Sequence, residues 1–291
     1  MNDLEGFERH RRRLHGIAYR MTASVADADD IVQEAWLRWQ RASNAKIVSD
    51  EAWLVRVVTN LAIDRSRAIS RRREDYVGPY LPEPLPDLAR PQFDDPEHHA
   101  ELVDSLTFAF LVMLDRLEPV ERAVLLLHDV FCYSFAEIAP IVDRSAANCR
   151  QIASRTRQRL RDEPRAPHRD VAHDRRTLHE LVGALAAGDA DRVVSLLSPN
   201  IVVMSDGGPQ RHAARRQVVG VHRASRLLLN LATRLTDTMT VEFVDANGGP
   251  AMLTRERGEP FLLLTIACDE AGHISHVYSV LNPDKLRLLD A

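Results

Sequence analysis

The chain has 291 residues, 45% of them hydrophobic, which is enough for two or three domains with cores of their own. Its formal net charge of −4 excludes a polycation, so nucleic-acid binding would have to come from local basic patches. The three cysteines form no C-x-x-C pair and no metal-ligand spacing appears, so we expect neither a metal nor a cofactor. Because no apolar run has the length of a signal peptide or a membrane span, we expect a cytoplasmic protein without membrane contact.

Three helices are predicted in the first 75 residues, over 7–21, 25–42 and about 50–73. Carboxylates crowd the first turns of the second helix, which suits the positive end of the helix dipole. The run DADDIVQEAWLRW is also typical of an acidic surface with exposed aliphatic side chains and the tryptophans Trp36 and Trp39. Such a surface could dock a basic partner, and both interpretations stay open.

The third predicted helix has one apolar and one polar face, and five arginines with no acid lie between Arg65 and Arg73. One interpretation is a solvated face with i,i+4 pairs. The other is a surface for single-stranded DNA, on which arginines neutralise phosphates and polar side chains bond to base edges. The polar residues that share an arc of roughly 80° are Arg56, Asn60, Asp64, Arg67 and Arg71.

A proline-rich linker follows, with six prolines in residues 75–96. Proline disfavours helix and holds the backbone extended, so this is a semi-rigid connector. Tyr80, Leu81 and Leu85 are apolar and need a surface to cover them. We therefore expect residues 80–85 to dock on another domain.

The second helical block runs from about 97 to 161. A helix is predicted over 97–117, and Pro119 opens the next one at its first position.

This block ends in a helix-turn-helix pattern. Ser134 and Glu137 are spaced as a capping box for a short helix over 134–142, and Ser145 is a good N-cap for a helix that begins at Ala146. Residues 144–161 contain six arginines and no acid, so the second helix could bind DNA; the alternative is an amphipathic hairpin with a solvated basic face. The residues predicted to share its buried face are Cys149, Ile152, Ala153, Thr156 and Leu160.

A third domain is predicted from about residue 172, after a polar linker over 164–171. Helices are expected up to residue 200 and over 219–234. Strands are expected over 201–205, 239–243, 251–255, 261–268 and 274–281. Helices followed by a curved antiparallel sheet predict an α+β cone with an internal pocket, which could bind a small-molecule ligand.

Two long segments resemble the extracytoplasmic-function sigma factors of bacterial RNA polymerase. VADADDIVQEAWLRW (25–39) and AWLVRVVTNLAIDRSR (52–67) are similar to region 2 of that family, and residues 117–160 are similar to its region 4. The resemblance implies an alternative sigma factor that directs core RNA polymerase to promoter DNA. In that family, the acidic helix contacts the β′ clamp helices, the third helix reads the −10 element, and the helix from Ala146 reads the −35 element.

The resemblance implies a set of contact residues for each role. For the polymerase they are Asp27, Asp29, Asp30, Ile31, Val32, Glu34 and Trp36. For the −10 element they are Trp53, Arg56, Asn60, Asp64, Arg65, Arg67 and Arg71. For the −35 element they are Arg144, Ser145, Ala147, Asn148, Arg150, Gln151, Ser154 and Arg155.

Two departures from the family pattern lie in the helix-turn-helix. Pro140 stands inside the first helix, where it removes a backbone hydrogen bond. Asp143 stands in the turn where the family usually has glycine, although Asp tolerates a left-handed backbone better than most residues.

The tail resembles the SnoaL-like branch of the NTF2-like fold, and its position after a sigma factor resembles the SigJ-like subgroup. Three motifs carry this likeness: GPYLPEPLPD (78–87), SDGGPQ (205–210) and NPDKL (282–286), with Pro209-Gln210 where the family has Gly-Lys. In that subgroup the tail binds back on the helical domains and tunes activity, so no separate anti-sigma factor is obligatory. The latch residues implied are Tyr80, Leu81, Pro82, Glu83, Pro84, Leu85, Asp206, Gly207, Gly208, Asn282, Pro283, Asp284, Lys285 and Leu286.

The expected fold is therefore multidomain, with two all-α sigma domains and a C-terminal α+β SnoaL-like (NTF2-like) cone. The expected boundaries are 1–75 for region 2, 76–96 for the linker, 97–163 for region 4, 164–171 for a second linker and 172–291 for the tail. One rival is a DNA-binding module fused to a small-molecule-binding or SnoaL-type enzymatic domain, with Asp206, His273 and His276 as candidate acids or bases. Another is a repressor that needs no polymerase. We expect no enzyme, because no nucleophile–base pair appears and fold resemblance alone does not carry chemistry.

Overall fold

The computed structural model describes residues 4–42, 47–73, 76–86, 106–161 and 170–290. The chain divides into two compact units. Unit 1 contains Met1–Glu74, Arg90–Leu106 and Phe110–Glu163; unit 2 contains Asp75–Ala89, Thr107–Ala109 and Pro164–Ala291. In the described ranges no helix is long and apolar enough to cross a membrane, and no group of three or more His, Cys, Asp or Glu side chains could hold a metal ion.

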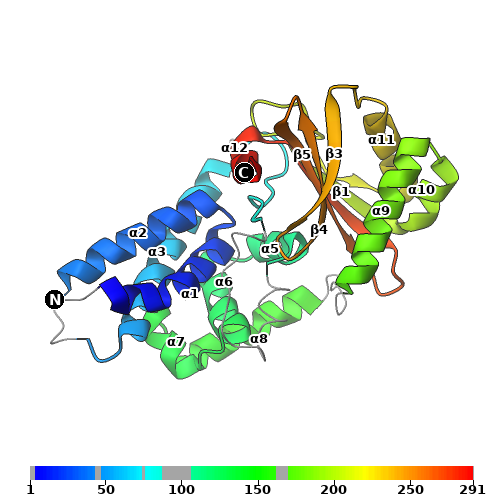
Figure 1. The fold of residues 1–291 in the computed structure, drawn as a ribbon. Coiled ribbons are helices and arrows are strands. Elements are labelled where there is room, and N and C mark those ends of the chain that lie inside the picture. Colours follow the sequence, from blue (N-terminus) through cyan, green and yellow to red (C-terminus); the bar gives the residue numbers. More distant parts are fainter. Residues whose placement is uncertain (1–3, 43–46, 74–75, 87–105, 162–169, 291) are drawn as a thin grey trace. The chain divides into compact units, whose positions relative to one another are not determined.

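Unit 1 begins with three mutually packed helices, α1 (Leu4–Thr22), α2 (Val25–Arg41) and α3 (Asp50–Arg73) (Figure 1). Their bounds agree with the sequence predictions to within a few residues. Apolar side chains three or four positions apart face inward, so that Leu14, Trp39 and Leu54 are all buried. Burial of this shared core holds the three helices together.

The next helix, α5 (Phe108–Asp115), has its first two residues in unit 2 and the rest in unit 1. The remaining helices of unit 1 are α6 (Pro119–Leu125), a π-helical turn η3 (Leu126–Val130), α7 (Phe135–Val142) and α8 (Ala146–Arg161). Pro119 occupies a first-turn position of α6, as predicted, and Glu118 and Glu121 form a capping box there. Of the helix predicted over 97–117, residues 97–105 lie outside the described residues. The π-helical turn was not predicted.

Within unit 1, α3 packs against α6 and α7, and α1 packs against α6. A polar network joins them. The Tyr133 hydroxyl donates to Glu51 Oε1 at 2.6 Å, and the Arg13 guanidinium donates to the same oxygen. Arg122 is buried and donates to the backbone oxygen of Met21 at 2.5 Å.

Burial and charge shift the acid–base behaviour of groups in this contact. Burial alone would raise the pKa of Glu51, but the hydrogen bond from Tyr133 and the charge of Arg13 outweigh it and hold that pKa below its ordinary value. Arg20 is fully buried, and its loss of solvation lowers its pKa to about 9. Its guanidinium lies over the ring of Phe131, 5.4 Å from the centroid.

Unit 2 combines helices with a six-stranded sheet. The helices are α9 (Val171–Ala187), α10 (Ala190–Leu196), α11 (Val221–Ala232) and α12 (Pro283–Leu286), with a 3-10 turn η4 (Arg287–Leu289). The strands are β1 (Leu197–Asp206), β2 (Val218–Val219), β3 (Met239–Ala246), β4 (Gly249–Glu256), β5 (Glu259–Cys268) and β6 (Ile274–Val280).

The strand order is β2-β1-β6-β5-β4-β3. The prediction of a purely antiparallel sheet is wrong at one place, because β1 and β6 run parallel. The strand expected over 201–205 begins earlier, at Leu197, and the helix expected over 219–234 is preceded by the short strand β2.

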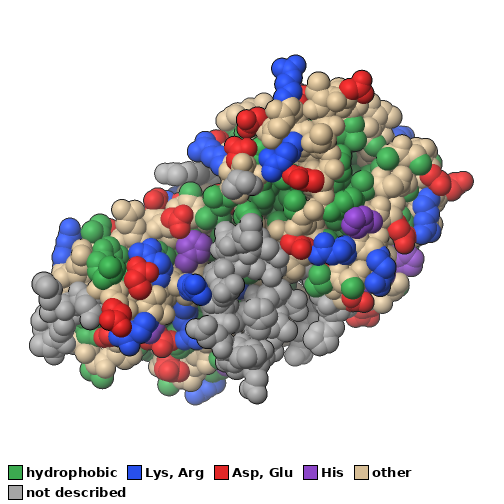
Figure 2. Space-filling model, in the orientation of Figure 1, with side chains coloured by type: hydrophobic (Ala, Val, Ile, Leu, Met, Phe, Trp, Pro, Cys, Tyr) green, Lys and Arg blue, Asp and Glu red, His purple; other side chains and the backbone are tan. Residues whose placement is uncertain are grey.

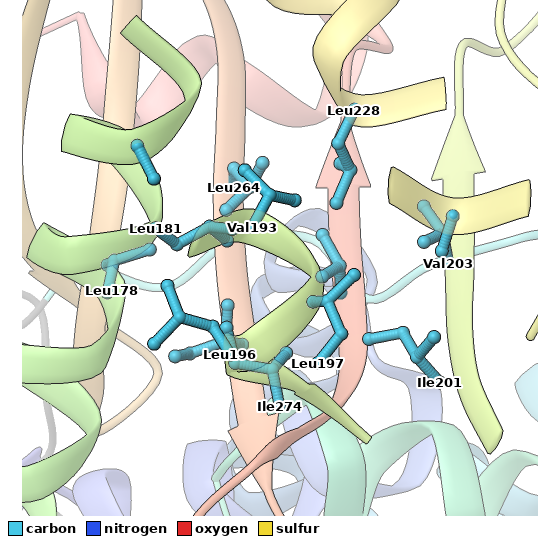
Figure 3. Packing of buried hydrophobic residues seen from close by; sticks show 14 of the residues in the cluster. Leu178, Leu181, Val193, Leu196, Leu197, Ile201, Val203, Leu228, Leu264 and Ile274 are labelled. Carbon is cyan, nitrogen blue, oxygen red and sulfur yellow. The ribbon is translucent and has the colours of Figure 1, made fainter. Parts of the chain in front are cut away.

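Apolar side chains from α9, α10 and α11 pack on one face of this sheet (Figure 3). One buried cluster contains Leu178 and Leu181 of α9, Val193 of α10, Leu228 of α11 and Val203 of β1. All five are at most 3% exposed. These side chains form a close-packed apolar cluster that joins the helices to the sheet.

Candidate nucleic-acid interface and linker contact

The acidic face of α2 is fixed by polar contacts with neighbouring helices. Ser24 caps the helix by accepting from the Asp27 amide at 3.2 Å. The Asp27 carboxylate pairs with Arg65 of α3, and Asp29 pairs with His15 of α1 at 3.1 Å. Asp30 is largely exposed and lies 3.7 Å from Arg65. The carboxylates thus form a negative surface whose position is set by α1 and α3.

Two of the predicted polymerase contacts in α2 are not on the surface. Ile31 and Val32 are only 3% and 2% exposed, so the expectation of exposed aliphatic side chains is wrong for these two, although Leu37 of the same run is exposed. They belong to the core that α2 shares with α1 and α3. Trp39 is buried as well, and Trp36 is half-buried with its ring 5.0 Å from that of Phe7. The exposed residues of α2 include the carboxylates Asp29 and Asp30 and one aliphatic side chain, Leu37.

The polar face of α3 has the arrangement expected from the helical period. Its five members are all exposed: Arg56, Asn60, Asp64, Arg67 and Arg71. Asp64 pairs with Arg67 at 3.2 Å. The other two residues predicted for this role point elsewhere, since Arg65 pairs with α2 and Trp53 packs on Trp39 with ring centroids 5.5 Å apart.

The helix-turn-helix is held by local hydrogen bonds. The Ser134 hydroxyl and the Glu137 carboxylate form the predicted capping box of α7. Pro140 lies within α7 without ending it. Asp143 ends the helix in the left-handed region with φ 54°, the conformation that favours glycine at this place. Ser145 then accepts from the Asn148 amide at 3.1 Å and starts α8.

Helix α8 turns its polar side outward. Cys149, Ala153 and Thr156 are buried as predicted, while Arg157 pairs with Asp129 instead of facing outward. Of the residues predicted for the −35 element, Asn148 is partly buried and the exposed ones are Arg144, Ser145, Ala147, Arg150, Gln151, Ser154 and Arg155.

Within unit 2, the linker docks around the carboxylate of Asp206, which is fully buried. One oxygen accepts from the Tyr76 hydroxyl at 2.5 Å and from the Gly208 amide at 3.1 Å. The other accepts from the Leu81 amide at 2.9 Å and from Lys285 Nζ at 2.7 Å. A buried charge is thus matched by one cation and three hydrogen-bond donors.

Lys285 connects α12 to the linker. Besides pairing with Asp206, its ammonium donates to the Leu81 carbonyl at 2.5 Å. It also lies 3.1 Å from the ring centroid of Tyr80 and 5.5 Å from that of Tyr76, in cation–π geometry. Burial, followed by the hydrogen bond to Asp206, raises the pKa of Tyr76, which therefore stays a neutral donor.

A second contact holds the other end of the docked segment. The Leu85 amide donates to Asn247 Oδ1 at 2.8 Å, and the Asn247 amide donates to the Leu85 carbonyl at the same distance. Pro86 forms a β-bridge with Ala246. Residues 81–85 are all buried, so the apolar side chains of the linker are covered, as their sequence predicts.

The turn after β1 needs its two glycines. A Cβ on Gly207 would lie 2.2 Å from the Arg211 carbonyl oxygen, and one on Gly208 would lie 2.6 Å from the Asn282 side chain. Asn282 in turn donates to the Tyr76 hydroxyl at 2.9 Å. Gln210, where the family has lysine, still donates to Asp284 at 3.4 Å.

Most of the predicted latch residues thus lie at this contact or beside it, but two of its members were missed. Tyr76 lies just before the GPYLPEPLPD motif, and no hydrophobic pattern around it in the sequence indicates that it is a contact residue. Asn247 belongs to an Asn-Gly turn, which predicts a hairpin and not a docking site.

Two family models match the chain. Sigma-70 region 2 covers residues 7–72, and Sigma-70 region 4 covers residues 107–160. The chain is 39% identical over 234 residues to the ECF RNA polymerase sigma factor SigJ of Mycobacterium tuberculosis, which is 80% of this chain and 74% of the relative. It is 29% identical over 288 residues to the probable ECF RNA polymerase sigma factor SigI of the same species, which is 97% and 94% of the two chains.

The fold has a solved counterpart. The crystal structure of the M. tuberculosis extracytoplasmic function sigma factor SigJ superposes with a TM-score of 0.75 at 31% identity, over 98% of each chain. Both the helical unit and the sheet unit are therefore shared with that protein.

Proposed function

Because the chain belongs to the extracytoplasmic-function (ECF) sigma factors and so directs RNA polymerase to specific promoters, we propose that its C-terminal unit regulates promoter use by holding the linker. The observation that carries this proposal is the buried Asp206 carboxylate, which binds Tyr76, Leu81 and Lys285 at once. The linker it holds is the connection between the two helical modules.

We propose contact roles for the exposed members of the residue sets that the family resemblance implies. On α2, the carboxylates Asp29, Asp30 and Glu34 would meet the β′ clamp helices. On α3, the exposed polar face would bind the −10 element as single-stranded DNA. On α8, the exposed arginines would contact phosphates, while Gln151 and Ser154 reach base edges of the −35 element.

The two helical modules cannot read both elements in their present packing. The elements are named for positions roughly 25 base pairs apart, which is about 85 Å of B-DNA at about 3.4 Å per base pair. In unit 1, α3 is in direct contact with α6 and α7. For α3 to bind the −10 element while α8 binds the −35 element, the two helical modules would therefore have to separate. The linker is the covalent connection that would then join them.

Docking of the linker restrains that separation. An extended residue spans about 3.4 Å, so docking of residues 76–86 shortens the linker length that can span the gap between the modules by about 37 Å. Both sides of the contact are on one chain, so the effective concentration is about millimolar and a weak contact suffices. On this account a separate anti-sigma factor is not required.

The rival view of the tail as a SnoaL-type enzyme finds no support at Asp206, its main candidate acid. Both carboxylate oxygens are occupied by groups of the linker, the turn and Lys285. His273, another candidate, is exposed beside Asp269 at the turn before β6.

Run-off transcription with purified core polymerase tests the proposal. Lys285→Ala removes the cation that joins α12 to the linker, and we expect more transcript than from the wild type at equal concentration. Arg287→Ala, two residues along, removes an exposed cation that pairs only with Asp284 and serves as the matched control. Equal output from all three proteins would rule out regulation by the latch.

A further inference from the structure

A second basic surface lies in the C-terminal unit. Between Asp206 and Asp237 the chain contains six arginines and two histidines but no acid. Two of these arginines make internal hydrogen bonds. Arg211 donates to the carbonyl oxygens of Phe261 at 2.5 Å and Leu281 at 3.1 Å, and Arg234 donates to Asn230 Oδ1 at 3.1 Å. The other four are available to a partner, and the stretch covers the loop after β1, strand β2 and helix α11.

Four exposed arginines of this stretch define what we call the α11 basic patch: Arg215 and Arg216 in the loop, and Arg223 and Arg226 on the helix. Strand β2 lies between the two pairs and contacts α11, which makes the surface continuous. In the described parts of the chain, none of the four is paired with a carboxylate.

The helix presents these charges away from the core. Ala224, Ser225 and Leu228 are buried against β1 and α10, while Arg223 and Arg226 are neighbours one turn apart on the outer side. Arg223 lies in the first turn of α11, close to the positive end of the helix dipole, and this turn contains no acidic residue that would offset the repulsion. This placement is unfavourable for the helix, and the charges therefore do not serve its stability.

Several other arginines of unit 2 pair with carboxylates. On the neighbouring helices α9 and α10, Arg192 pairs with Glu180. Over the face seen in Figure 2, acidic and basic side chains alternate. A solvated surface normally mixes both signs in this way, whereas the α11 basic patch carries one sign only.

We propose that the α11 basic patch binds the phosphate backbone of promoter DNA without regard to sequence. Duplex DNA carries one negative charge per about 1.7 Å of helix axis, and unpaired arginines are the side chains that neutralise it. The patch has no aromatic side chain of the kind enriched in protein interfaces. It also adjoins the docked linker, since a Cβ on Gly78 would lie 3.4 Å from Arg215 Cα.

The inference rests on the sigma-factor activity of the chain and not on the latch. The tail would add phosphate contacts to those made by α3 and α8, and would raise the affinity for any promoter by the same factor. It would not change which sequence is chosen.

Salt dependence of promoter binding by the complete chain with core polymerase tests the proposal. For Arg223→Gln/Arg226→Gln we expect the slope of log affinity against log salt concentration to fall in magnitude by about 1 to 2, at about 0.9 per phosphate contact. Arg175→Gln/Arg192→Gln removes the same charge from paired arginines of the same unit and should leave the slope unchanged.

Equal slopes for the two double variants would overturn the proposal. So would a loss of binding to core polymerase in the absence of DNA, because the patch would then dock on the enzyme. If the helix variant does not fold, Arg215→Gln/Arg216→Gln in the loop provides the same comparison.

Discussion

Asp206 and Lys285 illustrate how much depends on single side chains here. Asp206 is fully buried and Lys285 is 7% exposed, so each charge compensates the loss of solvation of the other. Both were identified from short motifs that lie far apart in the sequence, and their pairing could not be read from those motifs. The bond is formed only when β1 and β6 pair and bring their ends together.

Removing the ammonium while keeping the bulk of the side chain should destabilise unit 2. We expect Lys285→Met to lower the free energy of unfolding of this unit by about 3 kcal/mol, because a buried carboxylate loses its counter-charge. Exchange of the slowest amides in β1 and β6 measures it. A loss below about 1 kcal/mol, no larger than that for Arg287→Ala, would show that the pair contributes little.

Asp143 is a departure from the family pattern with a measurable cost. It adopts φ 54° and ψ 55° at the end of α7, a region where a Cβ is unfavourable. Asp143→Gly should therefore stabilise unit 1 by about 0.5 to 1 kcal/mol, and Asp143→Ala should destabilise it by a similar amount. Thermal unfolding followed by tryptophan fluorescence reports on unit 1, where all three tryptophans lie. Identical midpoints for the three proteins would contradict this.

At the scale of elements, Glu51 links α3 to the segment before α7 and makes their contact sensitive to acid. Its pKa is held below the ordinary value in the folded state, so the folded state binds fewer protons there than the unfolded state. The resulting stability is present above the unfolded pKa of about 4.3 and is lost as pH falls through the folded pKa.

The stability difference between the wild type and Glu51→Gln should therefore shrink as pH falls below about 4. Urea unfolding at a series of pH values measures it. Glu8→Gln, at an exposed pair with Arg11 within α1, is the control. A difference that stays constant from neutral pH into acid would mean that the Glu51 charge does not contribute to this contact.

Helix α8 should contribute a fixed number of phosphate contacts. Replacing Arg150 and Arg155 by Ala should reduce the salt slope of promoter binding by up to about 1.8, at about 0.9 for each contact. Arg157→Ala is an informative comparison, because this arginine already pairs with Asp129 and should change the slope less. No change in the double variant would mean that α8 does not touch the DNA backbone.

The sequence could predict elements whose pattern is local. The helical period placed α1, α2, α3 and α8 and the exposed face of α3, because a 3.6-residue repeat decides which side of a helix is buried. Prediction from the helical period failed where contacts with another element determine whether a side chain is buried. Ile31 and Val32 are buried because α2 is covered on two sides, and Arg65 turns from DNA toward Asp27 on another helix.

Local sequence patterns could not predict which distant segments pair with one another. The parallel alignment of β1 and β6 depends on a connection of many residues, and nothing in either strand marks its direction. Asn247 joins the linker only because a hairpin turn presents its side chain and backbone to Leu85. For the same reason the motifs of the tail indicated a latch without giving its hydrogen bonds.

At the scale of the whole molecule, the account is of a sigma factor that carries its own restraint. Two helical modules read a promoter, a proline-rich segment connects them, and the C-terminal unit holds part of that segment. Family membership establishes the first part. The restraint makes a further demand, since the linker must leave the C-terminal unit when the modules separate on DNA.

The amide of Leu81 reports on this step directly, because it donates to the Asp206 carboxylate only while the linker is docked. Hydrogen exchange at this amide should be compared between the free chain and the complex with core polymerase and promoter DNA. We predict slow exchange in the free chain and markedly faster exchange in the promoter complex. Equally slow exchange in both would contradict the account, since transcription would then proceed with the linker still held.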